Sequence, residues 1–154
     1  MAEAQRDTVL VVDDSPETLS FLTEAIERSG ATVLVAVAGD LALALVEEIT
    51  PDIILLDAMM PGMDGFETCR RLKAKGHLAH VPVIFMTGLS ETEHIVKGLG
   101  AGGTDYVTKP IAPDEILARI RVHLASARVA QSARAALDTT GRTLFAVDRG
   151  GTVL

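Results

Sequence analysis

The stretch IILLDAMMPGMDG, from Ile53 to Gly65, joins four aliphatic residues to an acid and then to a Pro-Gly turn. The aliphatic run predicts a strand that is buried on both faces. Asp57 follows that run directly, although a buried carboxylate without a partner is costly. We therefore expect Asp57 to be neutralised, paired or used in chemistry.

Similar short apolar runs lie on both sides of this stretch, and segments with helical periodicity separate them. The other predicted strands are residues 8–12, 32–37, 81–87 and 105–108. Three predicted helices begin after the cap residues Ser15, Asp64 and Ser90. The second helix is marked by Leu41, Leu45 and Ile49, and the last begins near Pro113. This alternation predicts an α/β fold with a doubly wound, five-stranded parallel sheet and five helices, the last of them extended.

The residues that follow the predicted strands are the first candidates for function. In open α/β sheets, functional groups gather beyond the carboxyl ends of the strands. Five polar residues stand there in this sequence: Asp13, Asp14, Asp57, Thr87 and Lys109. We expect these three acids, one hydroxyl and one ammonium group to share one rim of the sheet.

Neighbouring carboxylates repel each other by about 4 kcal/mol at ~4 Å and an effective dielectric of ~20. A hard divalent cation such as Mg²⁺ relieves that repulsion, because it binds carboxylates, water and phosphoryl oxygens. Beside such a cation, Asp57 can accept a phosphoryl group. Lys109 can then pair with the new phosphate, and Thr87 can donate a hydrogen bond to it.

Four motifs together resemble the receiver domain of two-component response regulators. They are VLVVDDSPE from Val9, IILLDAMMPGMDG from Ile53, VIFMTG from Val83 and YVTKP from Tyr106. The resemblance extends from residue 8 to residue 124. It implies a flavodoxin-like sheet in which the strands lie in the order 2-1-3-4-5.

The resemblance implies a role for each site residue. Asp57 would be the phosphoacceptor. Mg²⁺ would be held by Asp13, Asp14, Asp57 and the backbone carbonyl of Met59.

The same resemblance implies a switch that senses the phosphate. Thr87 and Lys109 would respond to the phosphoryl group, and Tyr106 would be the aromatic residue that rotates. The peptide bond before Pro110 is expected to be cis, an isomer that proline tolerates.

The sequence departs from the family pattern in several places. Apolar Met59 and Leu89 would flank the path of the hydrolytic water, which they cannot activate, so we expect a long-lived phosphoryl group. Ala112 precedes the last helix without a side-chain cap, which should make that helix less stable by about 1 kcal/mol than a Ser or Asp at this position would. The glycines of GLGAGGTDY, residues 98–106, predict a soft end to the fourth helix, where amide exchange over 96–101 should exceed that of the first helix.

Bulk properties exclude several classes of protein. The net charge of −7 argues against direct binding of nucleic acid by this chain. Residues 1–7 lack the apolar core of a signal peptide, and no apolar run is long enough to span a membrane. Cys69 is the only cysteine, which favours a reducing compartment, and we expect a cytoplasmic protein.

The predicted function is a phosphorylation-dependent switch of a two-component system. Its expected partners are a sensor histidine kinase or phosphotransfer protein and a downstream output, by analogy a transcriptional one. We expect no enzyme activity beyond its own phosphorylation and dephosphorylation. Two alternatives remain: a phosphate-independent, receiver-like binding module, and an Asp-nucleophile phosphatase. Against the phosphatase, the first strand ends in Asp-Asp rather than D-x-D, and no glycine-rich phosphate loop follows it.

The predicted domain organisation has four parts. Residues 1–7 are a flexible N-terminus, 8–125 the receiver domain and 126–141 a helical linker. DTTGRT, residues 138–143, is expected to break the helix, and 142–154 to be the truncated start of a downstream domain resembling the PAS type. The face made by the fourth helix, fifth strand and fifth helix, which includes Asp105 and Arg119, is a candidate dimer surface.

Overall fold

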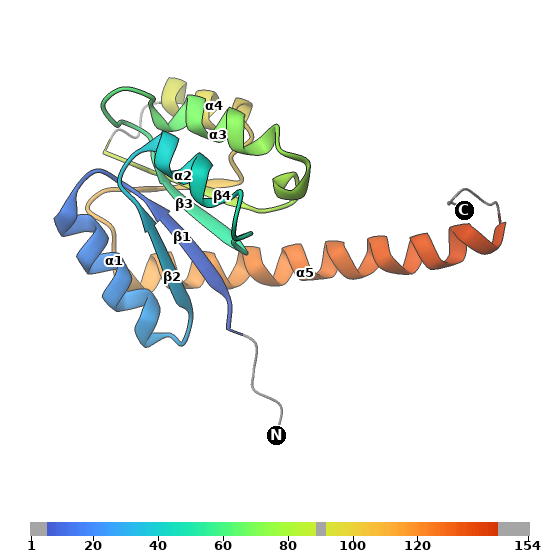
Figure 1. Ribbon diagram of the computed structural model, residues 1–154. Helices are drawn as coiled ribbons and strands as arrows, with labels where there is room; N and C mark the ends of the chain where they lie inside the picture. The colour runs from blue at the N-terminus through green and yellow to red at the C-terminus, as the bar shows by residue number, and fades with distance from the viewer. Residues whose placement is uncertain (1–5, 89–91, 145–154) are drawn as a thin grey trace. The chain divides into compact units, whose positions relative to one another are not determined.

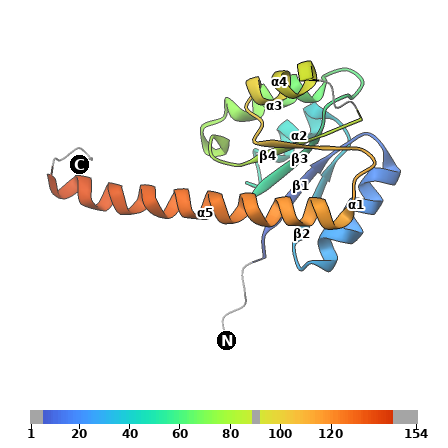
Figure 2. The same ribbon diagram turned by 180° about the vertical axis from the view of Figure 1, so that it is seen from behind.

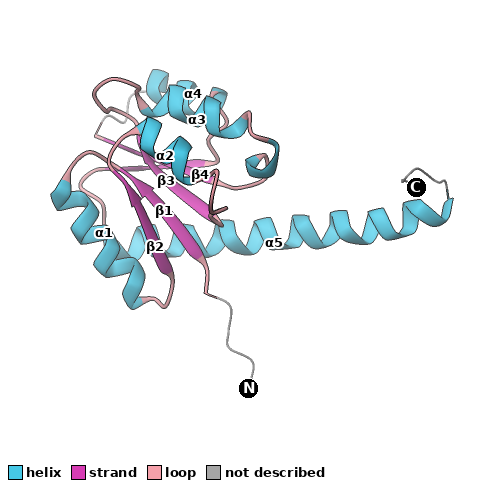
Figure 3. Ribbon diagram, in the orientation of Figure 1, coloured by secondary structure: helices cyan, strands magenta, loops and turns pink. Residues whose placement is uncertain are grey.

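The computed structural model describes residues 6–88 and 92–144, in which five strands alternate with helices (Figures 1 and 3). The strands are β1 (Thr8–Val12), β2 (Thr32–Ala36), β3 (Ile53–Asp57), β4 (Val83–Thr87) and β5 (Asp105–Thr108). The helices are α1 (Pro16–Arg28), α2 (Gly39–Leu45), α3 (Gly65–Lys73), α4 (Thr92–Gly100) and α5 (Pro113–Leu144), with a 3₁₀ turn, η1, at Gly76–Leu78.

The strands form one parallel sheet in the order β2-β1-β3-β4-β5. Val9 of β1 is in register with Val33 of β2 and Ile53 of β3, and Ile84 of β4 is in register with Asp105 of β5. The predicted α/β fold and strand order are therefore confirmed. Because all strands run the same way, their carboxyl ends lie along one edge.

Helices cover both faces of this sheet, with α2, α3 and α4 on one face and α1 with the start of α5 on the other (Figures 1 and 2). The predicted inner faces of α1 and α3 are buried: Leu19, Leu22 and Ile26, and Phe66, Cys69 and Leu72. Two predicted caps are also present. The Ser15 hydroxyl accepts a hydrogen bond from the Thr18 N–H at 3.3 Å, and the Asp64 carboxylate accepts one from the Glu67 N–H at 2.8 Å.

The second helix presents a different face to the core from the one the sequence suggested. Leu41 is 50% exposed, and Ile49, which lies beyond the end of α2 at Leu45, is 44% exposed, whereas Ala42 and Val46 are buried and Leu45 packs against the core. The reason is a close contact with α3: a Cβ on Gly39 would lie 2.2 Å from Thr68 Oγ1. A small residue therefore faces α3, and Leu41 turns outward, while Leu43 and Leu45 pack against the core.

The predicted helix break at residues 138–143 is wrong, because α5 continues to Leu144. A single interior glycine costs about 1 kcal/mol relative to alanine, which the preceding alanine-rich run can offset. The chain divides into two compact units, one ending at Arg121 and one beginning at Val122. The predicted strands of a PAS-type start fall in 145–154, and most of the predicted N-terminal segment falls in 1–5, outside the described residues. Within the described chain, no helix combines the length and apolar character needed to cross a membrane.

Candidate functional site

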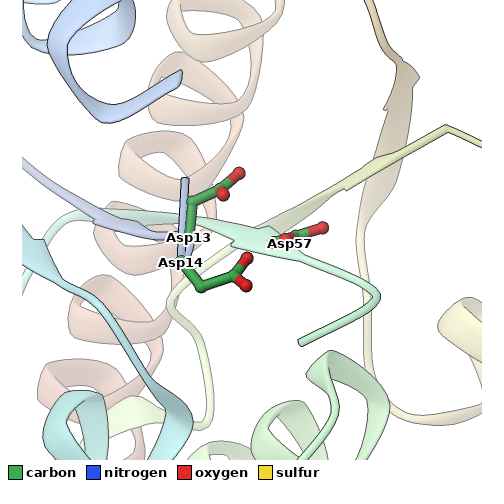
Figure 4. A group of neighbouring side chains, drawn as sticks. All are labelled: Asp13, Asp14 and Asp57. Carbon is green, nitrogen blue, oxygen red and sulfur yellow. The ribbon is translucent and has the colours of Figure 1, made fainter. Parts of the chain in front are cut away.

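Three carboxylates meet at the carboxyl ends of β1 and β3 (Figure 4). One oxygen from each of Asp13, Asp14 and Asp57 lies within 4.8 Å of the others. Asp13 is fully buried and Asp57 is 5% exposed, whereas Asp14 faces solvent. The acids that the sequence placed on one rim are therefore close neighbours.

Local hydrogen bonds fix the two buried acids. The Asp13 carboxylate accepts a hydrogen bond from the Ser15 N–H at 2.8 Å, and the Asp13 N–H donates to the Ala36 carbonyl at 3.1 Å. The Asp57 carboxylate accepts a hydrogen bond from the Met59 N–H at 3.3 Å. Both carboxylates are thus oriented by the backbone that follows their strands.

Gly65 has a role at this site that the sequence analysis did not assign. A Cβ at Gly65 would lie 2.1 Å from the Asp57 carbonyl oxygen, so no other residue fits there without a shift of the backbone. The Gly65 N–H donates to the Ala58 carbonyl at 2.9 Å, which closes the loop after β3. The available signal was a glycine at the start of the helix that follows the acid.

Lys109 connects the end of β5 to the acids. Its Nζ lies 3.0 Å from Asp13 Oδ2 and 3.5 Å from Asp57 Oδ1. The backbone N–H of Lys109 donates a hydrogen bond to the Thr87 carbonyl at 2.7 Å, and the Lys109–Pro110 peptide bond is cis. One ammonium group therefore partly neutralises two buried carboxylates.

The charge balance of the site is incomplete. Burial and the negative charge of Asp13 raise the pKa of Asp57 from 3.8 to about 6, although Lys109 and the Met59 N–H act in the opposite direction. Burial alone would lower the pKa of Lys109, but its hydrogen bonds and charge interactions with Asp13 and Asp57 outweigh burial and raise it. Negative charge is thus in excess over positive charge at this rim.

A divalent cation fits this donor set. The three carboxylates offer hard oxygen ligands within 4.8 Å of one another, which is the chemistry that Mg²⁺ and Ca²⁺ prefer. An added cation would also relieve the repulsion that raises the pKa of Asp57.

The other predicted site residues occupy different positions around the acids. Thr87 ends β4 and is 4% exposed, and Tyr106 on β5 is partly buried against the core. Both side chains line a small cavity beneath α4. Met59 is 55% exposed beside Asp57, and Leu89 lies outside the described residues.

The comparisons with known proteins agree on one family. The family model described as the response regulator receiver domain matches residues 9–121. The DNA-binding response regulator MtrA of Mycolicibacterium smegmatis is 40% identical over 122 residues, which are 79% of this chain and 52% of that protein. The DNA-binding dual master transcriptional regulator RpaA of Synechocystis is 36% identical over 127 residues, 82% of this chain and 53% of that protein.

A solved structure supports the same assignment. The receiver domain of the Francisella response regulator 1452 superimposes with a TM-score of 0.73 at 33% identity, covering 79% of this chain and 98% of that one. The chain spans about half the length of the curated relatives named above.

Proposed function

Since this chain belongs to the response regulator receiver domain family, we propose that Asp57 is the residue that accepts a phosphoryl group in its signalling switch. The donor is a phosphohistidine on a sensor histidine kinase or a phosphotransfer protein. The observation that carries this proposal is the position of Asp57, which is buried beside two further carboxylates and 3.5 Å from the Lys109 ammonium.

The transfer consists of one displacement at phosphorus. A carboxylate oxygen of Asp57 forms a bond to phosphorus while the bond from phosphorus to the donor's imidazole nitrogen breaks, and solvent supplies a proton to the imidazole. The N–H of Met59 and the ammonium of Lys109 hold the Asp57 carboxylate in place for this attack. Hydrolysis of the resulting acyl phosphate restores the carboxylate and releases phosphate.

Asp13, Asp14 and Asp57 would hold a Mg²⁺ ion, with the backbone carbonyl of Met59 as a further ligand. When bound, Mg²⁺ shields the charge that develops on the transferring phosphoryl group. Asp13 and Lys109 have a second role, because their ion pair keeps the ammonium next to Asp57.

The new phosphate changes the groups around it. Thr87, at the end of β4, would donate its hydroxyl to a phosphate oxygen, and Lys109 would pair with the phosphate charge. Tyr106 shares the cavity beneath α4 with Thr87, so its ring would rearrange in response. The two arrangements form an equilibrium that phosphorylation shifts.

The output of the switch is the face formed by α4, β5 and α5. Arg119 lies 2.7 Å from Asp105 on this face, and this pair would exchange partners if the face pairs with a second copy. The relatives named above are DNA-binding proteins, which favours a transcriptional output that lies outside this chain. The proposed setting is the cytoplasm, where the kinase domain and the transcriptional target are both found.

One experiment separates this function from its two alternatives. The chain is incubated with acetyl phosphate and Mg²⁺, and its intact mass is measured over time. A single phosphoryl adduct that is absent in Asp57→Asn supports the proposal. An unlabelled chain supports the phosphate-independent binding module, and repeated turnover of a phosphomonoester supports the phosphatase; either result would overturn the proposal.

A further inference from the structure

Phe85 lies between the proposed phosphate site and α4. It is a β4 residue, 3% exposed, and stands two positions before Thr87, so both side chains lie on the same face of the sheet. Its ring contacts Phe66 of α3 with a centroid distance of 5.2 Å. Lys97 of α4 in turn lies 5.0 Å above the Phe66 ring. These residues connect the end of β4 to α4.

Two glycines make room for the Phe85 ring. A Cβ on Gly98 of α4 would lie 3.0 Å from Phe85 Cδ2, and a Cβ on Gly103 would lie 2.6 Å from Phe85 Cε2. An alanine at Gly103 would require a shift of the ring or the backbone, and an alanine at Gly98 would press the ring away by a few tenths of an ångström. The backbone of α4 and of the loop after it therefore rests directly on the ring.

The contact at Gly98 is the most buried point of the last turns of α4. Among residues 95–100, where side chains are described, Gly98 is the only buried residue. The large apolar side chains of Val96 and Leu99 are 61% and 50% exposed. Because these turns bury a glycine rather than large side chains, they gain little apolar burial, and a small change at the Gly98 contact can move them.

We propose that the Phe85 ring, seated against Gly98 and Gly103, sets the position of α4 and couples it to the phosphate site. This inference rests on the proposed function of Asp57 for its signalling part. The ring and Thr87 line the same cavity as Tyr106 and Gly98, so a shift of Thr87 toward a phosphate changes the space that the ring occupies. Phe85 is a positioning residue in this scheme, since it touches neither the donor nor the phosphate.

The chain provides a matched pair of variants. Gly98→Ala and Gly100→Ala both replace a glycine of α4 with alanine, which by itself strengthens a helix. A Cβ on Gly98 would meet Phe85, whereas a Cβ on Gly100 would meet no atom within 4 Å. Of the two variants, only Gly98→Ala should press the helix and the ring apart.

Hydrogen exchange of the full chain without Mg²⁺ tests the contact itself. We expect the amides of residues 95–101 to exchange at least about fivefold faster in Gly98→Ala than in the parent, and no faster than the parent in Gly100→Ala. Equal exchange in the two variants would overturn the proposal. The same comparison in a Phe85→Leu background shows whether the ring is the cause. There, Gly98→Ala should change the exchange rate of residues 95–101 by no more than about twofold. An undiminished effect in that background would contradict it.

Labelling with acetyl phosphate tests the coupling to the phosphate site. A detached α4 lowers the cost of the rearranged state, so Gly98→Ala should be phosphorylated about threefold faster than both the parent and Gly100→Ala. A rate equal to that of Gly100→Ala would refute the coupling. Should Gly98→Ala fail to fold, Phe85→Leu replaces it, with beryllofluoride and Mg²⁺ in place of the phosphoryl group. Amide exchange in α4 of Phe85→Leu should then no longer change when beryllofluoride is added. A change as large as in the parent would refute the coupling. A parent chain that is never labelled would refute the function of Asp57, while the contrast in exchange between the two alanine variants would stand.

Discussion

The Lys109 ammonium lies 3.0 Å from the fully buried Asp13 carboxylate, although the two residues are 96 positions apart in the chain. The same ammonium lies 3.5 Å from Asp57. This ion pair joins the connection after β5 to the end of β1. It therefore contributes to the stability of the site as well as to its proposed chemistry.

Removal of Lys109 should destabilise the metal-free chain. Lys109→Met leaves Asp13 and Asp57 without their nearest positive charge. We expect the free energy of unfolding at pH 7 to fall by about 2–3 kcal/mol, less than for a fully buried pair because the Lys109 side chain is 28% exposed. Urea denaturation followed by circular dichroism measures this change. Arg28→Met, which removes an exposed ion pair with Glu24, should have a far smaller effect, and equal losses in the two variants would contradict the account.

The stability of the metal-free chain should depend on the protonation of Asp57. Its pKa is about 6 in the folded chain, above the ordinary value of 3.8, so the folded state holds the proton more tightly than the unfolded state. The contribution of Asp57 to stability is therefore fully present below about pH 4 and is lost as the pH rises to 6 and above. At ~1.4 kcal/mol per pKa unit, the loss is on the order of 2–3 kcal/mol.

Asp57→Asn removes this titration. In chelator-treated samples, the variant should be more stable than the parent at pH 7, and its advantage should shrink between pH 6 and pH 4. Asp40→Asn, which removes a carboxylate at an exposed position on α2, is the matched control. Denaturation curves at several pH values provide the test. A constant difference between Asp57→Asn and the parent would show that the ionised carboxylate carries no penalty.

The sequence predicted the chemistry of the rim better than the packing around it. Asp13, Asp14, Asp57 and Lys109 could be placed together because parallel strands end at one edge, whatever their neighbours are. The outward turn of Leu41 could not be predicted from periodicity, since it depends on the contact between Gly39 and Thr68. The contact of Phe85 with Gly98 and Gly103 could not be predicted for the same reason. It depends on two glycines that lie far from Phe85 in the sequence and leave room for its ring.

The polarity of Met59 should control the lifetime of the phosphoryl group. Its side chain is 55% exposed next to Asp57, but a thioether is a poor hydrogen-bond partner for an attacking water. Met59→Asn supplies an amide that can orient the water, so we expect the phosphoryl group to be lost roughly tenfold faster. Decay is measured by intact mass after removal of the phosphodonor. Met59→Leu should decay at the parent rate, and similar rates in Met59→Asn and Met59→Leu would rule out this role.

An improved cap should stabilise α5. Ala112 precedes Pro113 at the start of the helix, and its carbonyl accepts from the Ile116 N–H, but alanine has no side-chain acceptor for the free N–H groups of the first turn. Ala112→Asp provides one and should raise the free energy of unfolding by about 1 kcal/mol. Ala118→Ser, at an exposed position inside the helix, should give no gain. The prediction fails if denaturation shows no difference between Ala112→Asp and the parent.

One particular carboxylate among the three acids, that of Asp57, should carry the phosphate. After labelling with acetyl phosphate and Mg²⁺, borohydride reduces an aspartyl phosphate to homoserine, and peptide mass spectrometry locates the reduced residue. We expect homoserine at Asp57 alone, with Asp13 and Asp14 unchanged. Reduction at another residue, or at none, would contradict it.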